Sequence, residues 1–172
     1  MEKPMNEFDV YCGDNNYRYI LGTKGEKTLY CFGINPSTAT SDKDDETIRI
    51  VRGVAKKEGY TSFIMLNIYP QRATNPANLD NKANLKEYEK NLSMIIENIK
   101  DGSSVWAAWG NSIAKRLYLQ DCLNKIFIET KKKNIHWVKK GELTKKGNPG
   151  HPLGLKLRGM LNLPFTELKF KQ

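Results

Sequence analysis

The chain has 172 residues, of which 39% are hydrophobic, and it contains no internal repeat and no low-complexity tract. This length and composition predict one domain with one continuous core. The formal net charge of +9 and the sequence pI of about 9.4 favour a polyanionic partner, with nucleic acid first, although surface lysines that only keep a protein in solution would give the same charge.

The cysteines, the histidines and the apolar runs indicate which cellular environment and which bound groups to expect. The three cysteines, at positions 12, 31 and 122, have no paired spacing that would indicate disulfides or zinc, so we expect a reduced, cytoplasmic environment. His136 and His151 have no carboxylate at ligand spacing, so we expect no metal. The start, MEKPMNEFDV, is too charged for a secretory signal, and no apolar run is long enough to span a bilayer. We therefore expect a soluble protein with no cofactor, no membrane contact and no obligate protein partner.

The first third of the chain alternates between strand and helix patterns. Residues 17–21 and 28–32 are rich in β-formers and flank two glycines, which predicts a hairpin that leads into a central strand. Asp44 and Asp45 precede apolar residues at helical spacing, so we expect them to cap a helix that runs to about residue 57. The alternative is that this acidic pair lies beside a site and orients a base or a water. Residues 62–66, SFIML, form a short apolar run typical of a strand buried on both faces.

The same alternation continues through the rest of the chain. Residues 67–79 contain Pro70 and Pro76 and predict an irregular loop, and the helical spacing of 85–99 predicts a helix that stops before Gly102. Residues 104–108, SSVWA, predict a third buried strand. A further helix from about residue 113 leads to an apolar segment at 135–138, and the chain closes with a Lys- and Gly-rich loop into HPLGLKLRG.

Strands that alternate with helices predict the α/β class, because right-handed crossovers place parallel strands between two helical layers. We expect a three-layer α/β/α sandwich around a central, mainly parallel sheet of about four strands. A single domain would span residues 1–172, with the hairpin at about 11–32 and the core at about 28–158. Ligands of such sheets bind beyond the carboxyl ends of the strands.

Polar groups follow several of the predicted strands. In GINPSTA, Gly33 would let a ligand approach the backbone, the Asn35 amide both donates and accepts hydrogen bonds, and Pro36 stiffens the turn. Asn67 ends the SFIML strand. Each pattern also fits an ordinary turn or a capped loop.

The later segments carry two more groups of this kind. Trp109 and Gly110 follow the third strand, where a tryptophan is more often part of the core than a platform for stacking. His151 follows a flexible loop, so its imidazole is a candidate proton donor or neutral electrophile, with a surface histidine as the alternative. We expect Gly33, Asn35, Asn67, Trp109, Gly110 and His151 to converge on one pocket.

A set of cationic or hydroxyl side chains lies in the same predicted loops, where each is either a phosphate contact or a solvated surface group. The set consists of Arg72, Thr74, Lys145, Lys146 and Arg158.

Taken in order, the segments GINPS, FIMLN, VWAAWG and GHPL resemble the strand-end motifs of the uracil-DNA glycosylase superfamily, over roughly residues 28–158. The whole chain is also similar to a bacterial domain family of unknown function, number 1643. The pattern of that family is NPSTA, DD-x-T-x-R, N-x-[YF]-x-x-RAT, AWG and G-x-P-x-HPL, and nearly all of it is present.

The superfamily resemblance implies a uracil-DNA glycosylase-like fold and roles for individual residues. Asn35 takes the place of the Asp or Asn that positions the attacking water, in a motif most similar to the GINPG of the mismatch-specific branch. Asn67 matches the asparagine that reads the flipped pyrimidine, and His151 matches the histidine that stabilises charge on the departing base. Leu153 follows where members of the superfamily carry a loop that enters the DNA groove.

The chain departs from this pattern in three places. The first motif lacks Asp, the last reads HPL instead of HPS, and Ser37 stands in the place of a bulky gate. A small side chain at position 37 predicts a pocket that admits a larger or modified base. The DDET and RAT segments have no clear counterpart in the superfamily.

The sequence leads to one functional hypothesis and two alternatives. The leading hypothesis is that the protein recognises an extruded base or a nucleotide, with DNA as the first partner. In its catalytic form the protein would be a glycosylase-like hydrolase that cleaves the N-glycosidic bond. The alternatives are a noncatalytic nucleic-acid-binding module and an enzyme that acts on free nucleotides. Asn35 and His151 are the catalytic candidates, and the base-binding candidates are Gly33, Ile34, Pro36, Ser37, Asn67, Trp109 and Gly110.

Overall fold

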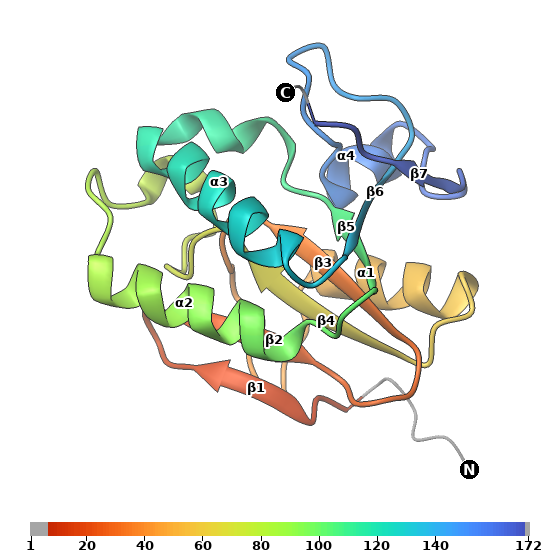
Figure 1. The fold of residues 1–172 in the computed structure, drawn as a ribbon, viewed down its shortest axis with the longest axis horizontal. Coiled ribbons are helices and arrows are strands. Elements are labelled where there is room, and N and C mark those ends of the chain that lie inside the picture. The colour runs from red at the N-terminus through yellow and green to blue at the C-terminus, as the bar shows by residue number, and fades with distance from the viewer. Residues whose placement is uncertain (1–6, 171–172) are drawn as a thin grey trace.

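A mixed sheet of seven strands runs through the computed structural model, which describes residues 7–170 (Figure 1). Residues 1–6, which begin the charged segment MEKPMNEFDV, and residues 171–172 lie outside the described part. The order across the sheet is β1-β2-β4-β3-β5-β6-β7. The strands are β1 (Val10–Gly13), β2 (Arg18–Gly22), β3 (Thr28–Gly33), β4 (Ser62–Asn67), β5 (Ser104–Ala107), β6 (His136–Lys140) and β7 (Phe165–Glu167).

The pairing of these strands confirms the α/β class and corrects the expected sheet. Strands β4, β3, β5 and β6 pair in parallel in that order, whereas β1 with β2, β2 with β4 and β6 with β7 are antiparallel. The prediction of a mainly parallel sheet of about four strands is therefore wrong, because half of the neighbouring pairs are antiparallel. The outer strands β1 and β7 have four and three residues and none of them is fully buried, so they lack the longer buried apolar runs from which the inner strands were predicted.

The predicted hairpin between residues 17–21 and 28–32 does not form. Strand β2 pairs with β1 on one side and with β4 on the other, where Leu21 lies opposite Met65. Thr23, the residue after β2, adds two hydrogen bonds to β4. Its backbone N–H donates to the Phe63 carbonyl, and its hydroxyl accepts from the Phe63 N–H. The apolar strand β4 therefore lies between the two segments that sequence proximity suggested as partners.

Helices cover both faces of the sheet, and three of them begin after a residue whose side chain caps the first turn. The helices are α1 (Glu46–Lys57), α2 (Leu85–Asn98), α3 (Leu117–Lys131) and α4 (Pro152–Leu157), with 3-10 turns η1 (Pro76–Asn78) and η2 (Gly110–Lys115). Asp45 caps α1 and Asn84 caps α2 through side-chain oxygens that accept backbone N–H groups. Helix α3 begins later than expected, because the extended backbone of Arg116 separates it from η2. No helix within residues 7–170 combines the length and apolar character needed to cross a bilayer.

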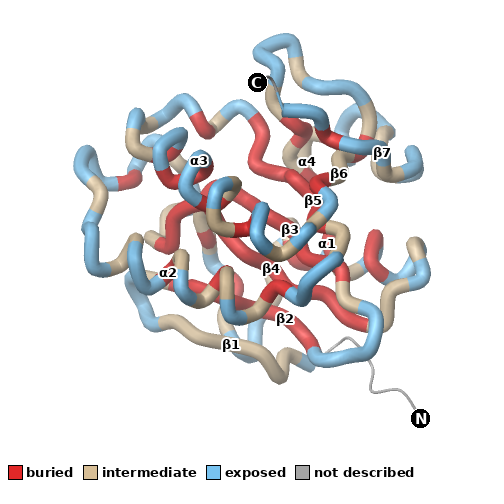
Figure 2. The backbone as a smooth tube through the Cα atoms, viewed as in Figure 1, coloured by how far each residue is buried: buried red, intermediate tan, exposed pale blue. Residues whose placement is uncertain are grey.

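The strand β3 separates two apolar clusters, one on each face of the sheet. Tyr30 and Phe32 face the cluster that contains α2 and α3, and Leu29 and Cys31 face the cluster that contains α1 and α4. This alternation follows from the two-residue period of a strand. Buried segments run through the centre of the molecule, where side chains from both helical layers meet the sheet (Figure 2).

The parallel strands bring three chain segments to one edge of the sheet. Gly33, the last residue of β3, lies opposite Asn67, the last residue of β4, and Phe32 lies opposite Ala107 of β5. Backbone hydrogen bonds continue past these ends, from Ile68 N–H to the Gly33 carbonyl and from Ala108 N–H to the Phe32 carbonyl. The segments that follow the three strands therefore start from a shared, rigid edge.

Helix α2 fixes one of these segments through Asn91. The buried Asn91 amide nitrogen donates to the carbonyls of Asn67 (2.9 Å) and Ile68 (3.4 Å). These carbonyls lie where the strand ladder ends, and a buried carbonyl without a donor is costly. Asn91 thus holds the backbone on which the Asn67 side chain is carried.

We expect Asn91→Ala to lower the free energy of unfolding by about 1–3 kcal/mol, the usual cost of leaving buried polar groups without partners. Ser93→Ala, an exposed substitution on the same helix, should change it by less than about 0.5 kcal/mol. Urea denaturation followed by circular dichroism measures both. Equal stability of the two variants would show that this anchor does not support the end of β4.

Candidate functional site

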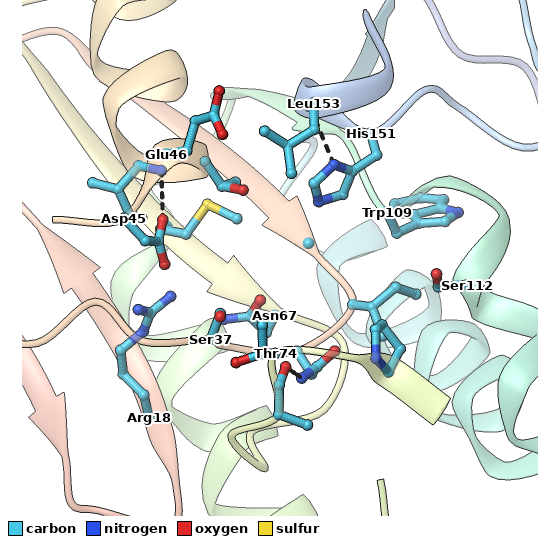
Figure 3. Close-up of a pocket in the computed structure, with 18 residues that line it drawn as sticks. Arg18, Ser37, Asp45, Glu46, Asn67, Thr74, Trp109, Ser112, His151 and Leu153 are labelled. Carbon is cyan, nitrogen blue, oxygen red and sulfur yellow. Dashed lines mark hydrogen bonds between the residues drawn. The ribbon is translucent and has the colours of Figure 1, made fainter. Parts of the chain in front are cut away.

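A cavity of about 400 Å³ lies at the edge where β3, β4 and β5 end (Figure 3). Its walls come from these strand ends, from the starts of α1 and α4, and from the loop after β4. The structure brings eight of the predicted site residues to this lining: Gly33, Ile34, Asn35, Ser37, Asn67, Thr74, Trp109 and His151. The lining also contains ten residues outside that predicted set: Arg18, Asp45, Glu46, Thr47, Ile48, Met65, Ala73, Pro76, Ser112 and Leu153.

Gly33 makes room for the Asn67 side chain. A Cβ atom at position 33 would lie 3.0 Å from Asn67 Oδ1 and 3.0 Å from Met65 Cε, which is closer than nearly all ordinary contacts of a Cβ. Because the two residues are register partners at the ends of β3 and β4, this crowding is set by the sheet itself. A side chain at position 33 would therefore force Asn67 or Met65 to shift, and the glycine leaves the floor of the cavity open.

Asn67 is a buried amide without a protein partner. Its side chain is 1% exposed, and neither Nδ2 nor Oδ1 has a hydrogen-bond partner among the described residues. Such atoms are rare in folded proteins, because each costs about 1–3 kcal/mol relative to a paired one. Among residues 7–170 five buried side-chain atoms are unpaired, and three of them belong to Asn67 and Arg18, which both line this cavity.

Asn35 is held in one orientation by the loop around it. Its amide nitrogen donates to the carbonyls of Pro36 (3.0 Å), Gln71 (3.3 Å) and Ala73 (2.8 Å). All donor capacity is thereby directed at the backbone, and no described residue donates to the amide oxygen. Asn35 can therefore offer an acceptor to a ligand or a water, but no proton.

His151 presents a donor to the cavity. It caps α4, and its Nδ1 accepts from the Leu153 N–H at 3.2 Å, so in the neutral ring the proton lies on Nε2. The second ring nitrogen points into the cavity (Figure 3). Burial lowers the pKa of His151 below its ordinary value, and the nearby Asp45 carboxylate opposes this only in part. The neutral imidazole is thus the form that faces the site at neutral pH.

Gly110 places His151 against the sheet. It has φ +67°, its N–H donates to the Pro149 carbonyl at 2.9 Å, and a Cβ there would lie 3.0 Å from His151 Cβ. A left-handed backbone without a side chain is therefore needed for the last loop to close. Gly110 and Pro36, both predicted to bind ligand, are absent from the cavity lining and act on it through their neighbours.

Trp109 belongs mainly to the core. It is 3% exposed and packs against Trp137 and Phe127, with ring centroids 5.9 Å and 6.1 Å away. It also contributes to the cavity wall, where it supplies apolar surface beside His151. The core interpretation that the sequence favoured is confirmed by this packing.

Two acidic residues line the cavity from the start of α1. Asp45 is a cap, as predicted: Oδ1 accepts from Ile48 N–H and Oδ2 from Ala39 N–H. Glu46 is exposed and pairs with Lys156 of α4 at 2.8 Å, and this hydrogen bond lowers the pKa of its carboxyl. Capping, the favoured interpretation of Asp45, is confirmed, and its place in the cavity lining agrees with the alternative that an acidic residue here lies beside a site.

Arg72 is tied to the protein by hydrogen bonds from all three guanidinium nitrogens. It donates to the carbonyls of Ser37 and Ala39 at 2.9 Å each, to the Asp14 carbonyl at 2.8 Å and to the Tyr11 hydroxyl at 2.7 Å. These bonds hold the loop after β3. Arg72 does not line this cavity, and its bonds to the protein leave it little free donor capacity for the phosphate contact that was predicted from the sequence.

The remaining phosphate candidates lie outside the cavity lining, with one exception. Thr74 is exposed at the mouth of the cavity. Lys145 and Lys146 are exposed in the loop between β6 and α4, which Thr144 ties to Asn111 of η2. Arg158 is exposed after α4, where its Nε donates to the Gly154 carbonyl. Their part in phosphate binding stays a prediction.

No group of three His, Cys, Asp or Glu side chains within residues 7–170 is arranged to hold a metal ion.

Comparison with known proteins identifies the family. A family model described as "Protein of unknown function (DUF1643)" matches residues 18–153, which is well over half of the chain, so the chain belongs to this family. No curated protein and no solved structure matches significantly. Every residue that lines the cavity falls within the matched segment. The family description names no activity, so the function must be argued from the cavity.

The lowered pKa of His151 has a consequence for stability. Between its ordinary value of about 6.5 and its lower value in the fold, the unfolded chain binds a proton that the folded protein does not. Above pH 6.5 His151 is neutral in both states and its lowered pKa has no effect on stability. As the pH falls below 6.5, protonation of the unfolded chain lowers the free energy of unfolding. We expect the free energy of unfolding to fall from pH 7.5 to pH 5.5 by more in the wild type than in His151→Gln.

Urea titrations at the two pH values measure this difference. The control is His136→Gln, which leaves His151 as the single histidine, so that one imidazole signal in the NMR spectrum reports its titration directly. A titration midpoint at or above 6.5 for that signal would contradict the buried environment described for His151.

Proposed function

We propose that the cavity binds a pyrimidine base, extruded from a nucleic acid or carried by a nucleotide, and that Asn67 reads the edge of that base. The observation that carries the proposal is the buried Asn67 amide, which lines the cavity and whose donor and acceptor both lack partners among residues 7–170. A volume of about 400 Å³ fits a small-molecule site, since such pockets span about 300–1,000 Å³.

The chemistry of the amide suits a base edge. An asparagine presents one donor group and one acceptor side by side, and a pyrimidine presents a complementary acceptor and donor along its edge. Ile34 and Trp109 add apolar walls against which a ring can pack. The order of the motifs along the chain, which resembles the uracil-DNA glycosylase superfamily, supports the same role for Asn67 and a related fold.

Cleavage of the N-glycosidic bond is the catalytic form of this proposal. Water would attack the sugar carbon and release one proton to solvent, the bond to the base would break, and the base would leave with the electron pair and take up a proton from solvent. His151 Nε2–H is suited to stabilise the charge on the departing base, and the free oxygen of Asn35 is suited to orient the water. Because an amide cannot take the proton of that water, we expect turnover to be slow.

The charge of the protein favours a phosphate-bearing partner. A net charge of +9 attracts DNA or RNA, and Thr74, Lys145, Lys146 and Arg158 are the side chains proposed to meet phosphates outside the cavity. Binding to an oligonucleotide should therefore weaken as salt rises. Strong binding of free nucleotides with little dependence on salt would favour the enzyme on free nucleotides instead.

Asn67→Ala should abolish the preference for a base. Wild-type protein is expected to bind single-stranded DNA with one central modified pyrimidine more tightly than the same strand with an abasic site. The variant should lose this difference, by a factor on the order of ten to a hundred, because about 1–3 kcal/mol of paired amide contacts disappears. Fluorescence anisotropy measures both affinities.

The matched control is Asn124→Ala, an exposed asparagine on α3. It should bind both strands as the wild type does. Wild-type affinity that is the same for the two strands would remove the basis for base recognition.

Two variants test the catalytic form. His151→Ala should slow base release by a factor on the order of a hundred or more with little loss of binding, as removal of one preorganised donor typically does. Asn35→Asp should speed release, because a carboxylate can activate the water. Single-turnover assays with oligonucleotides that contain modified pyrimidines measure both rates.

The same assays decide between the catalytic and noncatalytic accounts. Absence of base release by both the wild type and Asn35→Asp, together with measurable and base-dependent binding, would establish a noncatalytic nucleic-acid-binding module.

A further inference from the structure

A buried cation forms one wall of the cavity. Arg18 begins β2, is 2% exposed, and points its guanidinium toward the cavity beside Asp45 (Figure 3). One nitrogen, Nη1, donates to the Ala39 carbonyl at 3.1 Å, whereas the buried Nε has no hydrogen-bond partner in the described residues. A buried arginine normally has its donors paired with carboxylate or carbonyl groups, because an uncompensated charge in the interior is costly.

The protein supplies little negative charge to balance Arg18. Arg72 donates to the same Ala39 carbonyl, so two guanidinium groups meet at one oxygen. The Asp45 carboxylate attracts the Arg18 charge, but its two oxygens already accept backbone N–H groups, and Arg18 forms no ion pair with any described residue. The wall around Arg18 therefore carries excess positive charge and an unused donor.

We propose that the ligand of this cavity carries an anionic group, a carboxylate on the base or a phosphate of a nucleotide, and that this group binds Arg18. The proposal rests on the function proposed above and specifies the substrate class. A guanidinium offers planar, paired donors that match the oxygens of either anion. The same geometry would give the free Nε a partner.

The position of Ser37 allows such a group to reach Arg18. In the view of Figure 3 the small Ser37 side chain is on the same side of the cavity as Asn67 and Arg18, and all three residues line the cavity. A ring read by Asn67 would thus direct a substituent past Ser37 toward the cation. Burial lowers the pKa of Arg18 to about 10, which still leaves the guanidinium charged at neutral pH.

The test compares ligands that differ only in charge. The first pair is 5-carboxy-2′-deoxyuridine and its 5-carbamoyl analogue, the second is the corresponding deoxycytidine pair, and the third compares each pyrimidine mononucleotide with its nucleoside. Isothermal titration calorimetry with wild-type protein should show at least one anionic member bound tighter than its neutral partner, by a factor on the order of ten to a hundred. The carboxylate pairs and the phosphate pairs identify which source of the anion the cavity uses.

Arg18→Met should reduce that preference to less than about threefold while Asn67-dependent binding of the neutral analogue persists, and Arg18→Lys should retain part of it. The control Arg49→Met, an exposed arginine on α1, should retain the wild-type preference. Because the wild-type comparison needs no variant, a misfolded Arg18→Met protein leaves the test intact.

Three results would overturn the proposal, and they separate it from the proposed function. Equal binding of the charged and neutral analogues by wild-type protein would reject the anion site and leave base recognition standing. A preference that survives in a folded Arg18→Met variant would place the anion elsewhere. No binding of any pyrimidine ligand, free or in an oligonucleotide, would reject base recognition and the anion site together.

Discussion

The side chain of Asn67 occupies the floor of the cavity, and the surrounding structure is arranged to keep it there. Gly33 opposite leaves the space it needs, and Asn91 of α2 binds the backbone carbonyl of the same residue. A leucine at position 67 would extend the apolar run of β4 without an unpaired amide. An amide that costs about 1–3 kcal/mol per unpaired atom is consistent with a group whose partner is a ligand.

The other polar groups are oriented by backbone contacts, which leaves one defined function to each. The Asn35 amide nitrogen donates to carbonyls, which leaves its oxygen as the group that a ligand could use. The His151 Nδ1 accepts from Leu153 N–H, which leaves Nε2–H to face the site. Arg72 holds the loop after β3 in place through hydrogen bonds to the Ser37 and Ala39 carbonyls. Preorganised donors and acceptors of this kind favour binding of one ligand shape, because little rearrangement is needed when it enters.

The sequence predicted what local patterns encode and missed what depends on distant segments. The apolar runs and caps predicted β4, β5, α1 and α2, and the strand-end polar groups predicted a shared site that includes Asn35, Asn67 and His151. The order of the sheet was not accessible, because β4 inserts between β2 and β3 through long-range pairing. Arg18 was missed although a charge at the start of the apolar segment RYILG was a signal of an unusual environment. Arg72 was predicted to bind phosphate, but its bonds to carbonyls distant in the chain could not be predicted from spacing.

The most direct test of base recognition observes the Asn67 side chain itself. Protein labelled with nitrogen-15 would be titrated with the pyrimidine nucleosides and nucleotides, and the side-chain amide signals would be assigned by comparison with Asn67→Ala. A ligand that is read by Asn67 should move both of its amide proton signals, since one gains a new acceptor and the other responds to a new donor at Oδ1. Saturable binding that leaves the Asn67 signals in place would contradict the central claim that this amide reads the base.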